Sequence, residues 1–197
     1  MSVVTRLVRS DDAEAIVAIY APIVERTAIS FEEVAPNADE VREQIATRGA
    51  TWPWLVADDG DVLGYAYASR HRVRAAYRWS VDVSAYVHER ARGRGVARAL
   101  YTRLLAMLAA QGFHRAYAGI ALPNDASLAL HRAVGFTQIA VYHQVGFKTG
   151  AWHDVAWLER MLSPSVTPGE PIAVSALPPA LLAPQQLLLH SSTRESG

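Results

Sequence analysis

The chain has 197 residues, of which 51% are hydrophobic, enough for one domain with a complete core. Its 19 basic and 19 acidic residues balance, which excludes the strongly basic surface of a nucleic-acid or membrane-surface binder, and we expect neither partner. Cysteine is absent, which excludes disulfides, thiolate metal sites and a cysteine nucleophile. With no signal-peptide pattern and no apolar run of about 18 residues, we expect a cytoplasmic protein.

The first fifty residues have the patterns of a strand and two helices. Val3–Val8 is predicted to be a strand. Asp11 or Asp12 is placed to cap the helix after it, because carboxylates accept hydrogen bonds from the first helical N–H groups. A second helix is expected over Ala38–Arg48, with Gly49 at its end.

The middle of the chain alternates between strand and helix patterns. Trp54–Ser69 is predicted to form a hairpin about an Asp-Gly turn, and Tyr77–Val87 to form a further strand. Apolar residues at helical spacing begin at Val96 and end before Gly112, and the strand Arg115–Leu122 follows.

A short helix and two strands complete this region. The helix is expected to begin at Asn124 or Asp125 and to stop at Gly135. The strands are expected over Thr137–Val141 and Val155–Leu158, on either side of a Lys-Thr-Gly turn. The resulting order, β-α-α-β-β-β-α-β-α-β-β, predicts an α/β (α+β) domain with helices on the faces of its sheet.

The composition changes near Ser163, where a proline-rich segment begins. Six of the ten prolines lie between residues 163 and 197, and repeated proline precludes a long helix. We therefore divide the chain into a domain over residues 1–162 and a tail over residues 163–197. The tail is expected either to fray or to pack against its own domain or a second subunit.

A glycine-rich loop lies between the predicted strand that precedes it and the helix that follows. Gly93 and Gly95 expose backbone there, and a helix N-terminus offers unpartnered N–H groups and partial positive charge to a phosphate. Arg92, Arg94 and Arg98 add charge. The spacing fits neither the Walker loop nor the dinucleotide fingerprint. From this signal alone, a phosphate site and an ordinary strand-to-helix turn both stay open.

Two motifs together carry a family resemblance. Arg90–Gly95 fits the pattern Gln/Arg-x-x-Gly-x-Gly/Ala, and the segment PNDASLALHRAVGF follows further along the chain. They resemble the two cofactor motifs of the GCN5-related N-acetyltransferases (GNAT). The resemblance implies the GNAT fold, a mixed central sheet with helices on both faces and a splayed central strand pair that binds acetyl-CoA, without a metal. The cofactor-binding residues that it implies are Ala85, Tyr86, Val87, Arg92, Gly93, Arg94, Gly95, Val96, Ala97, Arg98, Asn124 and Ser127.

Longer segments resemble a narrower family, the phosphinothricin N-acetyltransferases and the related acetyltransferases of methionine sulfone and sulfoximine. They include TAISFE, WPWLVAD, RAAYRWSVDVSAYV and GAWHDVAWLER, and with others they cover nearly all of Val3–Leu162. This resemblance implies acetylation of the α-amino group of a small amino acid whose side chain carries a phosphinyl or sulfonyl group. It also implies a homodimer.

Transfer from a thioester to an amine requires a group that removes a proton from the amine. Asp82 stands in an otherwise apolar predicted strand just before the glycine loop, and we interpret it as this base; a solvent-facing strand position is the alternative. The resembling enzymes usually have Glu there. Because Asp is one methylene shorter, a bridging water or a different base is favoured. With no cysteine for an acyl intermediate, direct transfer in a ternary complex is the simplest mechanism.

Two histidines are further catalytic candidates. His131 lies on the helix after Asn124, where many relatives carry a Tyr near the thiol, and a structural role fits its position equally well. His153, in GAWHDV, resembles a motif of the narrower family. It either assists proton removal or holds a loop through a hydrogen bond with Asp154.

Residues that bind the acceptor are expected in two places. Arg72 and Arg74 alternate along a segment predicted to be extended, so their side chains share a face. Guanidinium groups bind carboxylate or phosphinate in bidentate fashion, which suits an acidic amino acid; a solvated loop is the alternative. Tyr77 also matches the relatives. Phe31 is expected to wall the pocket, or else to lie in the core.

Two other functions stay open at this point. The same chemistry on another amine, such as a polyamine or a peptide N-terminus, differs only in the acceptor pocket. A module that senses acetyl-CoA without turnover would lack a base, and Asp82 and His131 argue against it.

Overall fold

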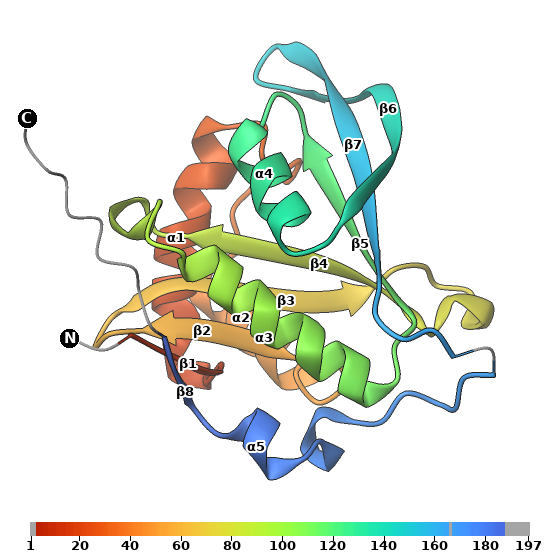
Figure 1. Ribbon diagram of the computed structural model, residues 1–197. Helices are drawn as coiled ribbons and strands as arrows, with labels where there is room; N and C mark the ends of the chain where they lie inside the picture. Colours follow the sequence, from red (N-terminus) through yellow and green to blue (C-terminus); the bar gives the residue numbers. More distant parts are fainter. Residues whose placement is uncertain (1–2, 166, 188–197) are drawn as a thin grey trace, which may run out of the picture.

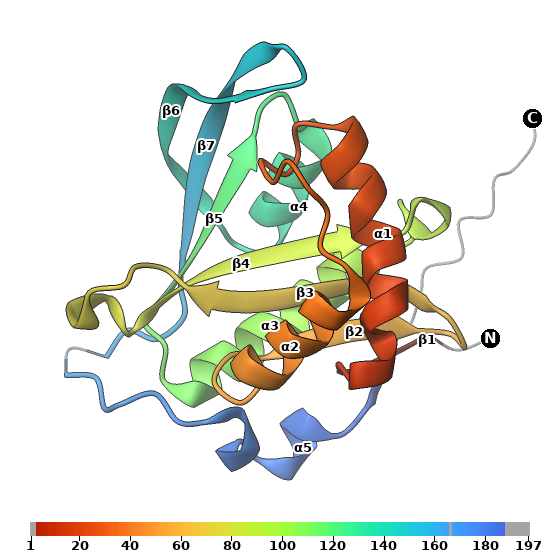
Figure 2. The same ribbon diagram turned by 180° about the vertical axis from the view of Figure 1, so that it is seen from behind.

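The computed structural model describes residues 3–165 and 167–187, which form one eight-stranded sheet with helices on both faces (Figures 1 and 2). The strand order across the sheet is β6-β7-β5-β4-β3-β2-β1-β8. The strands are β1 Val3–Leu7, β2 Trp54–Asp58, β3 Val62–Arg70, β4 Ser80–Val87, β5 Arg115–Ala121, β6 Thr137–Lys148, β7 Ala151–Met161 and β8 Gln185–Leu187. The helices are α1 Ala13–Arg26, α2 Ala38–Arg48, α3 Val96–Gln111, α4 Asp125–Ala133 and α5 Pro179–Leu182.

This arrangement confirms the predicted fold class and the predicted order of elements up to β7. Helices α1 and α2 cover one face of the sheet, whereas α3 lies across the other (Figures 1 and 2). Neighbouring strands run antiparallel except β4 and β5, which are parallel. The sheet is therefore mixed, as the GNAT resemblance implies.

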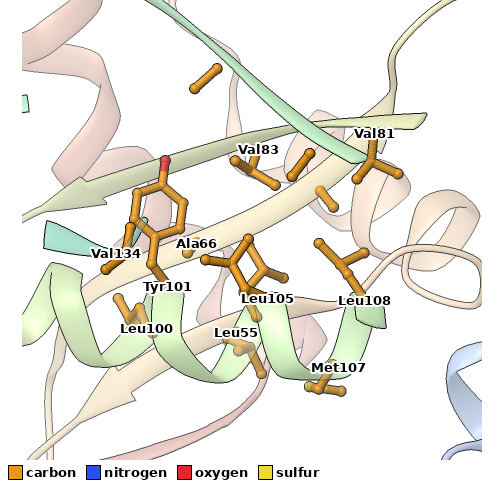
Figure 3. Packing of buried hydrophobic residues seen from close by; sticks show 14 of the residues in the cluster. Leu55, Ala66, Val81, Val83, Leu100, Tyr101, Leu105, Met107, Leu108 and Val134 are labelled. Atoms are coloured by element: carbon orange, nitrogen blue, oxygen red, sulfur yellow. The ribbon is translucent and has the colours of Figure 1, made fainter. Parts of the chain in front are cut away.

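Helix α3 provides much of the core. Leu100, Leu104 and Leu108 recur on one of its faces and are completely buried, as their helical spacing predicts. Figure 3 shows this side of α3 turned toward Val81 and Val83 of β4. Burial of each such leucine stabilises the fold by about 1.5–3 kcal/mol, so α3 fixes the position of the strand that carries the candidate site.

The parallel strands β4 and β5 separate soon after they meet. Their ladder joins only Ser80–Asp82 to Arg115–Tyr117. Beyond these residues β4 continues to Val87 and stays paired with β3 on its other edge, while β5 continues to Ala121 paired with β7. The edges of β4 and β5 that face each other are consequently splayed, and Figure 1 shows the two strands diverging.

Several predicted boundaries were wrong. Strand β4 begins at Ser80 instead of Tyr77, because the chain makes a 3-10 turn over Ala75–Tyr77 first. Strands β6 and β7 are much longer than predicted and meet at a turn that contains Thr149 and Gly150. Most side chains of β6 are exposed and its register shifts twice, so its apolar pattern is too weak to reveal the full length.

Asp12 precedes α1 but does not cap it with its side chain, contrary to the prediction. The 3-10 turn before the helix directs the carboxylate backward, where it accepts a hydrogen bond from the backbone N–H of Arg9 at 2.7 Å. It also accepts two from the guanidinium of Arg6, at 2.7 and 2.8 Å. Asp12 therefore joins β1 to the start of α1.

The described part of the tail packs on the domain. Val174 and Leu177 are buried in the main core, and β8 pairs antiparallel with β1. The buried guanidinium of Arg103, on α3, donates to the carbonyl oxygens of Leu181 at 2.9 Å and Ala183 at 2.8 Å. Residues 188–197 of the predicted tail lie outside the described residues. In the described ranges, no helix has the length and apolar character needed to cross a membrane.

We predict that Leu177→Ala lowers the free energy of unfolding by about 2–4 kcal/mol, because it empties a fully enclosed position between the tail and the core. Leu177 is 3% exposed, whereas Ile172 in the same tail is 41% exposed. Ile172→Ala is the matched control and should cost less than about 1 kcal/mol. Urea titrations of both variants measure the difference; equal and small losses would mean that the tail adds nothing to the core.

Candidate active site

A narrow cavity of about 60 Å³ lies where β4 and β5 separate. Its walls come from the free edges of the two strands, and its far side comes from α3 and α4. The lining residues are Ile29, Val83, Ser84, Ala85, Tyr86, Tyr101, Ala118, Gly119, Ile120, Ala121, Asn124, Ser127 and His131. Beyond Asp82 the described residues provide no ladder partner for this edge of β4, so its backbone groups are available to a bound molecule.

The glycine loop leads into the N-terminus of α3. Gly93 and Gly95 have φ of 73° and 83°, the left-handed region that disfavours other residues. A Cβ at either position would meet nothing within 4 Å, so the glycines are needed for backbone conformation and leave the approach to the helix end open. Arg92, Arg94 and Arg98 are exposed around the loop, and Val96 is buried beneath it. The structure thus has the open, positively charged helix terminus that binds anions.

A larger hollow of about 830 Å³ adjoins the loop on the outer side of α3. Gly93, Arg94, Gly95 and Arg98 line one end of it, and Gln185 and Gln186 of β8 line the opposite wall. That the tail borders the loop could not be predicted, because a three-residue strand after several prolines has no recognisable sequence pattern.

Helix α4 presents a second N-terminus to the cavity. The side-chain oxygen of Asn124 accepts a hydrogen bond from the backbone N–H of Ser127 at 3.1 Å, which confirms the predicted cap. Both residues line the cavity. The N-terminus of α4 therefore borders this cavity, whereas the loop before α3 borders the larger hollow.

His131 is buried on α4 and its side chain faces the cavity wall. Its Nδ1 lies 2.8 Å from the carbonyl oxygen of Ser127, which can only accept, so Nδ1 carries the proton. Nε2 then accepts a hydrogen bond from the hydroxyl of Tyr101 at 3.1 Å. Burial lowers the pKa of His131, although its hydrogen bond with Ser127 opposes this. Burial also raises the pKa of Tyr101.

Sequence reasoning assigned Tyr101 no role, since it sits at an ordinary core position of α3. Figure 3 shows its ring rising from α3 toward the sheet. The structure brings it together with His131 at the cavity, so the two form one hydrogen-bonded unit.

Asp82 projects from the α1/α2 face of β4 and has a partner that the sequence did not reveal. Its Oδ1 lies 2.7 Å from Nδ1 of His71, whose ring stacks on Tyr117 at a centroid distance of 4.3 Å. Burial raises the pKa of Asp82, while the hydrogen bond from His71 and the charge of Arg72 act in the opposite direction.

A second pocket, of about 400 Å³, adjoins the narrow cavity and shares four wall residues with it: Ile29, Tyr86, Gly119 and Ala121. Its other walls are Ser30, Phe31, Tyr142, Val145, Val155 and Trp157. Phe31 is 40% exposed and walls this pocket, which agrees with the first of its two predicted positions. The pocket is largely apolar and opens toward the splayed strands.

Lys148, the one lysine of the sequence, holds a wall of this second pocket. Its ammonium group on β6 donates to the carbonyl oxygens of Val24, Ser30 and Glu32 at 2.6, 2.7 and 2.6 Å. All three of its donors are thereby used. The loop that carries Phe31 is fastened to the β6–β7 hairpin.

The arginines predicted to bind the acceptor do not lie on a regular extended segment, because the chain bends repeatedly between Arg70 and the 3-10 turn. The guanidinium carbon of Arg72 lies 5.7 Å from the Trp157 ring centre, and its charge acts on Asp82. Arg74 is exposed and precedes the 3-10 turn. Tyr77 is half-exposed, and its ring lies edge-on to the ring of His71 with 6.2 Å between the ring centroids.

His153 does not bond to Asp154, contrary to one of the two roles considered for it. Adjacent residues of a strand point to opposite faces, so their side chains cannot meet. Nε2 of His153 instead lies 3.0 Å from the carbonyl oxygen of Lys148. Asp154 accepts from His143 at 2.9 Å and from the backbone N–H of Gln144 at 2.8 Å. His153 thus lies in the hairpin, with its ring 6.3 Å from that of Phe31.

Over the described ranges, no cluster of three histidine, cysteine or carboxylate residues has a geometry suited to a metal ion. Residues 5–157 match the family model described as an acetyltransferase (GNAT) domain. The chain belongs to the GNAT acetyltransferase family. The resemblance drawn from the two cofactor motifs is thereby confirmed.

Individual relatives and structures of this family agree with that assignment. The phosphinothricin N-acetyltransferase of Alcaligenes faecalis is 44% identical over 161 residues, 80% of this chain and 82% of that protein. The L-methionine sulfoximine/L-methionine sulfone acetyltransferase of Pseudomonas aeruginosa is 35% identical over 157 residues, 78% of this chain and 91% of that protein. A phosphinothricin acetyltransferase from Sinorhizobium meliloti, solved in complex with acetyl-CoA, has a TM-score of 0.80 at 36% identity, covering 90% of this chain and 98% of that one.

We predict that His131 makes the stability of this GNAT domain pH-dependent. Burial lowers its pKa in the folded state below 6.5, the ordinary value, so the unfolded chain binds a proton first as pH falls. The free energy of unfolding should therefore decrease below about pH 6.5, by up to about 1.4 kcal/mol per pH unit. His131→Gln should remove this part of the decrease. Urea titrations between pH 5 and 8 measure it, and parallel curves for the two proteins would contradict the assignment.

Proposed function

We propose that the chain transfers the acetyl group of acetyl-CoA to the α-amino group of a small amino acid that carries a tetrahedral phosphinyl or sulfonyl group, such as phosphinothricin or methionine sulfone or sulfoximine. The observation that carries this proposal is the pair of adjoining cavities. One lies between the splayed strands and reaches the N-terminus of α4, and the other is an amino-acid-sized pocket that adjoins it.

The residues present fit acetyl-CoA. The loop N–H groups from Gly93 to Arg98 would hold the diphosphate, since both glycines leave the helix end open. Backbone groups of Ala85–Val87, which lack a strand partner on the β5 side in the described residues, would hold the pantetheine arm and the thioester oxygen. Asn124 and Ser127 would border the same arm. When bound, the cofactor supplies an activated acetyl group.

The chain's own residues would then handle two protons. The acceptor nitrogen must lose one before it attacks. Asp82, which lies on the same face of β4 as the cavity residue Ser84, is the carboxylate that would drive this loss directly or through a bridging group. His131 and Tyr101 lie at the cavity wall, where the sulfur would leave. The hydroxyl hydrogen of Tyr101 would turn from Nε2 of His131 toward the sulfur to serve as its donor. His153 keeps the hairpin that borders Phe31 in place.

Two features support the proposed acceptor class. The apolar walls formed by Phe31, Val145 and Trp157 suit the methylene groups of a small amino acid. Arg72 reaches the wall residue Trp157, and guanidinium groups bind phosphinate or carboxylate oxygens. Arg74 lines, together with Arg72, a separate pocket of about 380 Å³ bordered by Trp52, Phe113 and Glu170. The names of the relatives specify the same class of substrate.

We also propose that residues 1–162 are the catalytic unit, with the tail as its support, and that the protein is a homodimer. The β6–β7 hairpin supports the dimer, because Ile139, Phe147 and Trp152 are 52%, 59% and 60% exposed. The rings of Phe147 and Trp152 pack on each other at 5.3 Å. Sedimentation equilibrium measures the mass directly, and a monomer at micromolar concentration would refute this part.

We predict that Gly95→Ala weakens binding of coenzyme A by roughly tenfold, because the left-handed backbone costs alanine about 1–2 kcal/mol and the loop relaxes away from the diphosphate. Gly60→Ala is the matched control, since Gly60 also has positive φ and open space but lies in the β2–β3 turn. Calorimetric titration with coenzyme A measures both. Unchanged affinity in Gly95→Ala, or equal losses in the two variants, would contradict the phosphate site.

Turnover of amines tests the function itself. We expect thiol release from acetyl-CoA with phosphinothricin, L-methionine sulfone or L-methionine sulfoximine, and slower release with polyamines and peptide N-termini. Arg72→Ala should raise KM for these acceptors several-fold, by loss of a bidentate contact, while affinity for coenzyme A stays the same. Arg74→Ala, measured beside it, shows whether both arginines contribute. Tight binding of coenzyme A with no turnover of any amine would favour a sensing module instead.

A further inference from the structure

His71 has no role in the mechanism above, yet the fold places it against Asp82 and against Trp157, a wall residue of the acceptor pocket. It follows the end of β3, and the β3–β4 ladder pairs Ser69 with Asp82. The hairpin therefore brings the two side chains together, with Nδ1 of His71 and Oδ1 of Asp82 separated by 2.7 Å.

The ring of His71 is held in one orientation by three contacts, with Asp82, Tyr117 and Trp157. It stacks on Tyr117 with an interplanar angle of 17°, and it meets the Trp157 ring edge-on at 6.3 Å. Its side chain is 11% exposed. Trp157 also lines the acceptor pocket, so the imidazole contacts a residue that borders the space where an amino acid would bind.

The hydrogen bond to Asp82 also selects the tautomer of His71. An ionised carboxylate can only accept, so Nδ1 carries the proton and Nε2 keeps its lone pair. Among the residues that the structure describes, none is hydrogen-bonded to Nε2, and this nitrogen is not sealed from solvent. The charged and titratable groups around the ring are Asp82 from β4, Tyr117 from β5, and Arg72 and Tyr77 from the intervening loop.

We infer that Nε2 of His71 is the atom that takes the proton from the acceptor's amino group, and that Asp82 orients the imidazole and stabilises its charged form. This inference rests on the proposed function and deepens it. Asp82 is one methylene shorter than the Glu usual in the resembling enzymes. Here an imidazole, instead of a water, bridges the distance between the carboxylate and the amine.

The resulting step is balanced in atoms and electrons. The ammonium form of the acceptor gives one proton to Nε2 and becomes a neutral amine. Its lone pair forms a bond to the acetyl carbon, the carbon–sulfur bond breaks, and the electron pair of that bond leaves on sulfur. As the amide forms, the second proton passes from the nitrogen to the departing thiolate, which becomes a thiol, and the proton on His71 returns to solvent.

The first test is His71→Asn, because the amide nitrogen of Asn can still donate to Asp82 but nothing replaces Nε2. We expect kcat to fall by roughly a hundredfold or more, the range for loss of a general base, with the affinity for coenzyme A unchanged as a check of folding. If Asp82 removes the proton unaided, His71→Asn keeps most of the wild-type kcat, and the inference is overturned.

The second test is chemical rescue of His71→Ala. The space left between Tyr117 and Trp157 should admit added imidazole, and kcat should recover as its concentration rises. With substituted imidazoles the recovered rate should increase with their basicity, which a purely structural role of His71 would not produce. Asp82→Asn should also lose activity but gain nothing from imidazole, since His71 still fills the space.

His143→Ala is the matched control, because Nδ1 of His143 forms a similar pair with Asp154 at 2.9 Å, but the His143 side chain is 77% exposed and does not line the acceptor pocket. It should keep wild-type kcat and be indifferent to imidazole. If the wild-type protein turns over but imidazole does not restore the kcat of His71→Ala, the inference is overturned and the proposed function stands. A wild-type protein that acetylates no amine in the panel would overturn the proposed function, and the inference with it.

Discussion

The separation of β4 from β5 is the constraint on which the rest of the molecule depends. Three ladder pairs hold the two parallel strands together, after which β4 stays with β3 and β5 stays with β7. Buried backbone groups need partners, so the open edge of β4 is stable only if another molecule or solvent satisfies it. Each strand leads to a helix N-terminus, with Gly95 before α3 and Asn124 before α4, and Asn124 lines the cavity between the strands.

The surrounding elements hold this gap open and give it two ends. The buried leucines of α3 pack against one face of β4. Lys148 joins the loop that ends at Glu32 to the β6–β7 hairpin through its hydrogen bonds. The phosphate end is therefore built from backbone and exposed arginines, whereas the acceptor end is built from aromatic side chains. This division explains why the first end has a readable sequence motif and the second does not.

Sequence reasoning was accurate where a local pattern fixes the backbone. The glycine pair, the Asn124 cap and the α3 heptad-like spacing each involve residues a few positions apart, and each was found in the predicted place. The partnership of His71 with Asp82 could not be foreseen, because it depends on the register of β3 against β4 and on Tyr117 from a third strand. The place of Tyr101 at the cavity was missed for a different reason, since an aromatic residue at a core position of a helix ordinarily serves only to fill the core.

The charges of Asp82, His71 and Arg72 offset one another at the proposed acceptor end. Before an amino acid binds, Asp82 brings one negative charge to a partly buried place, and burial alone would favour its protonated form. His71 and Arg72 counter that effect, so a carboxylate can persist next to apolar walls. In the proposed reaction an incoming ammonium would be attracted by this charge, and transfer of its proton to the imidazole would leave His71 and Asp82 as an ion pair with no net charge. The proton transfer would thus add no net charge to these apolar surroundings while it produces the neutral amine that nucleophilic attack requires.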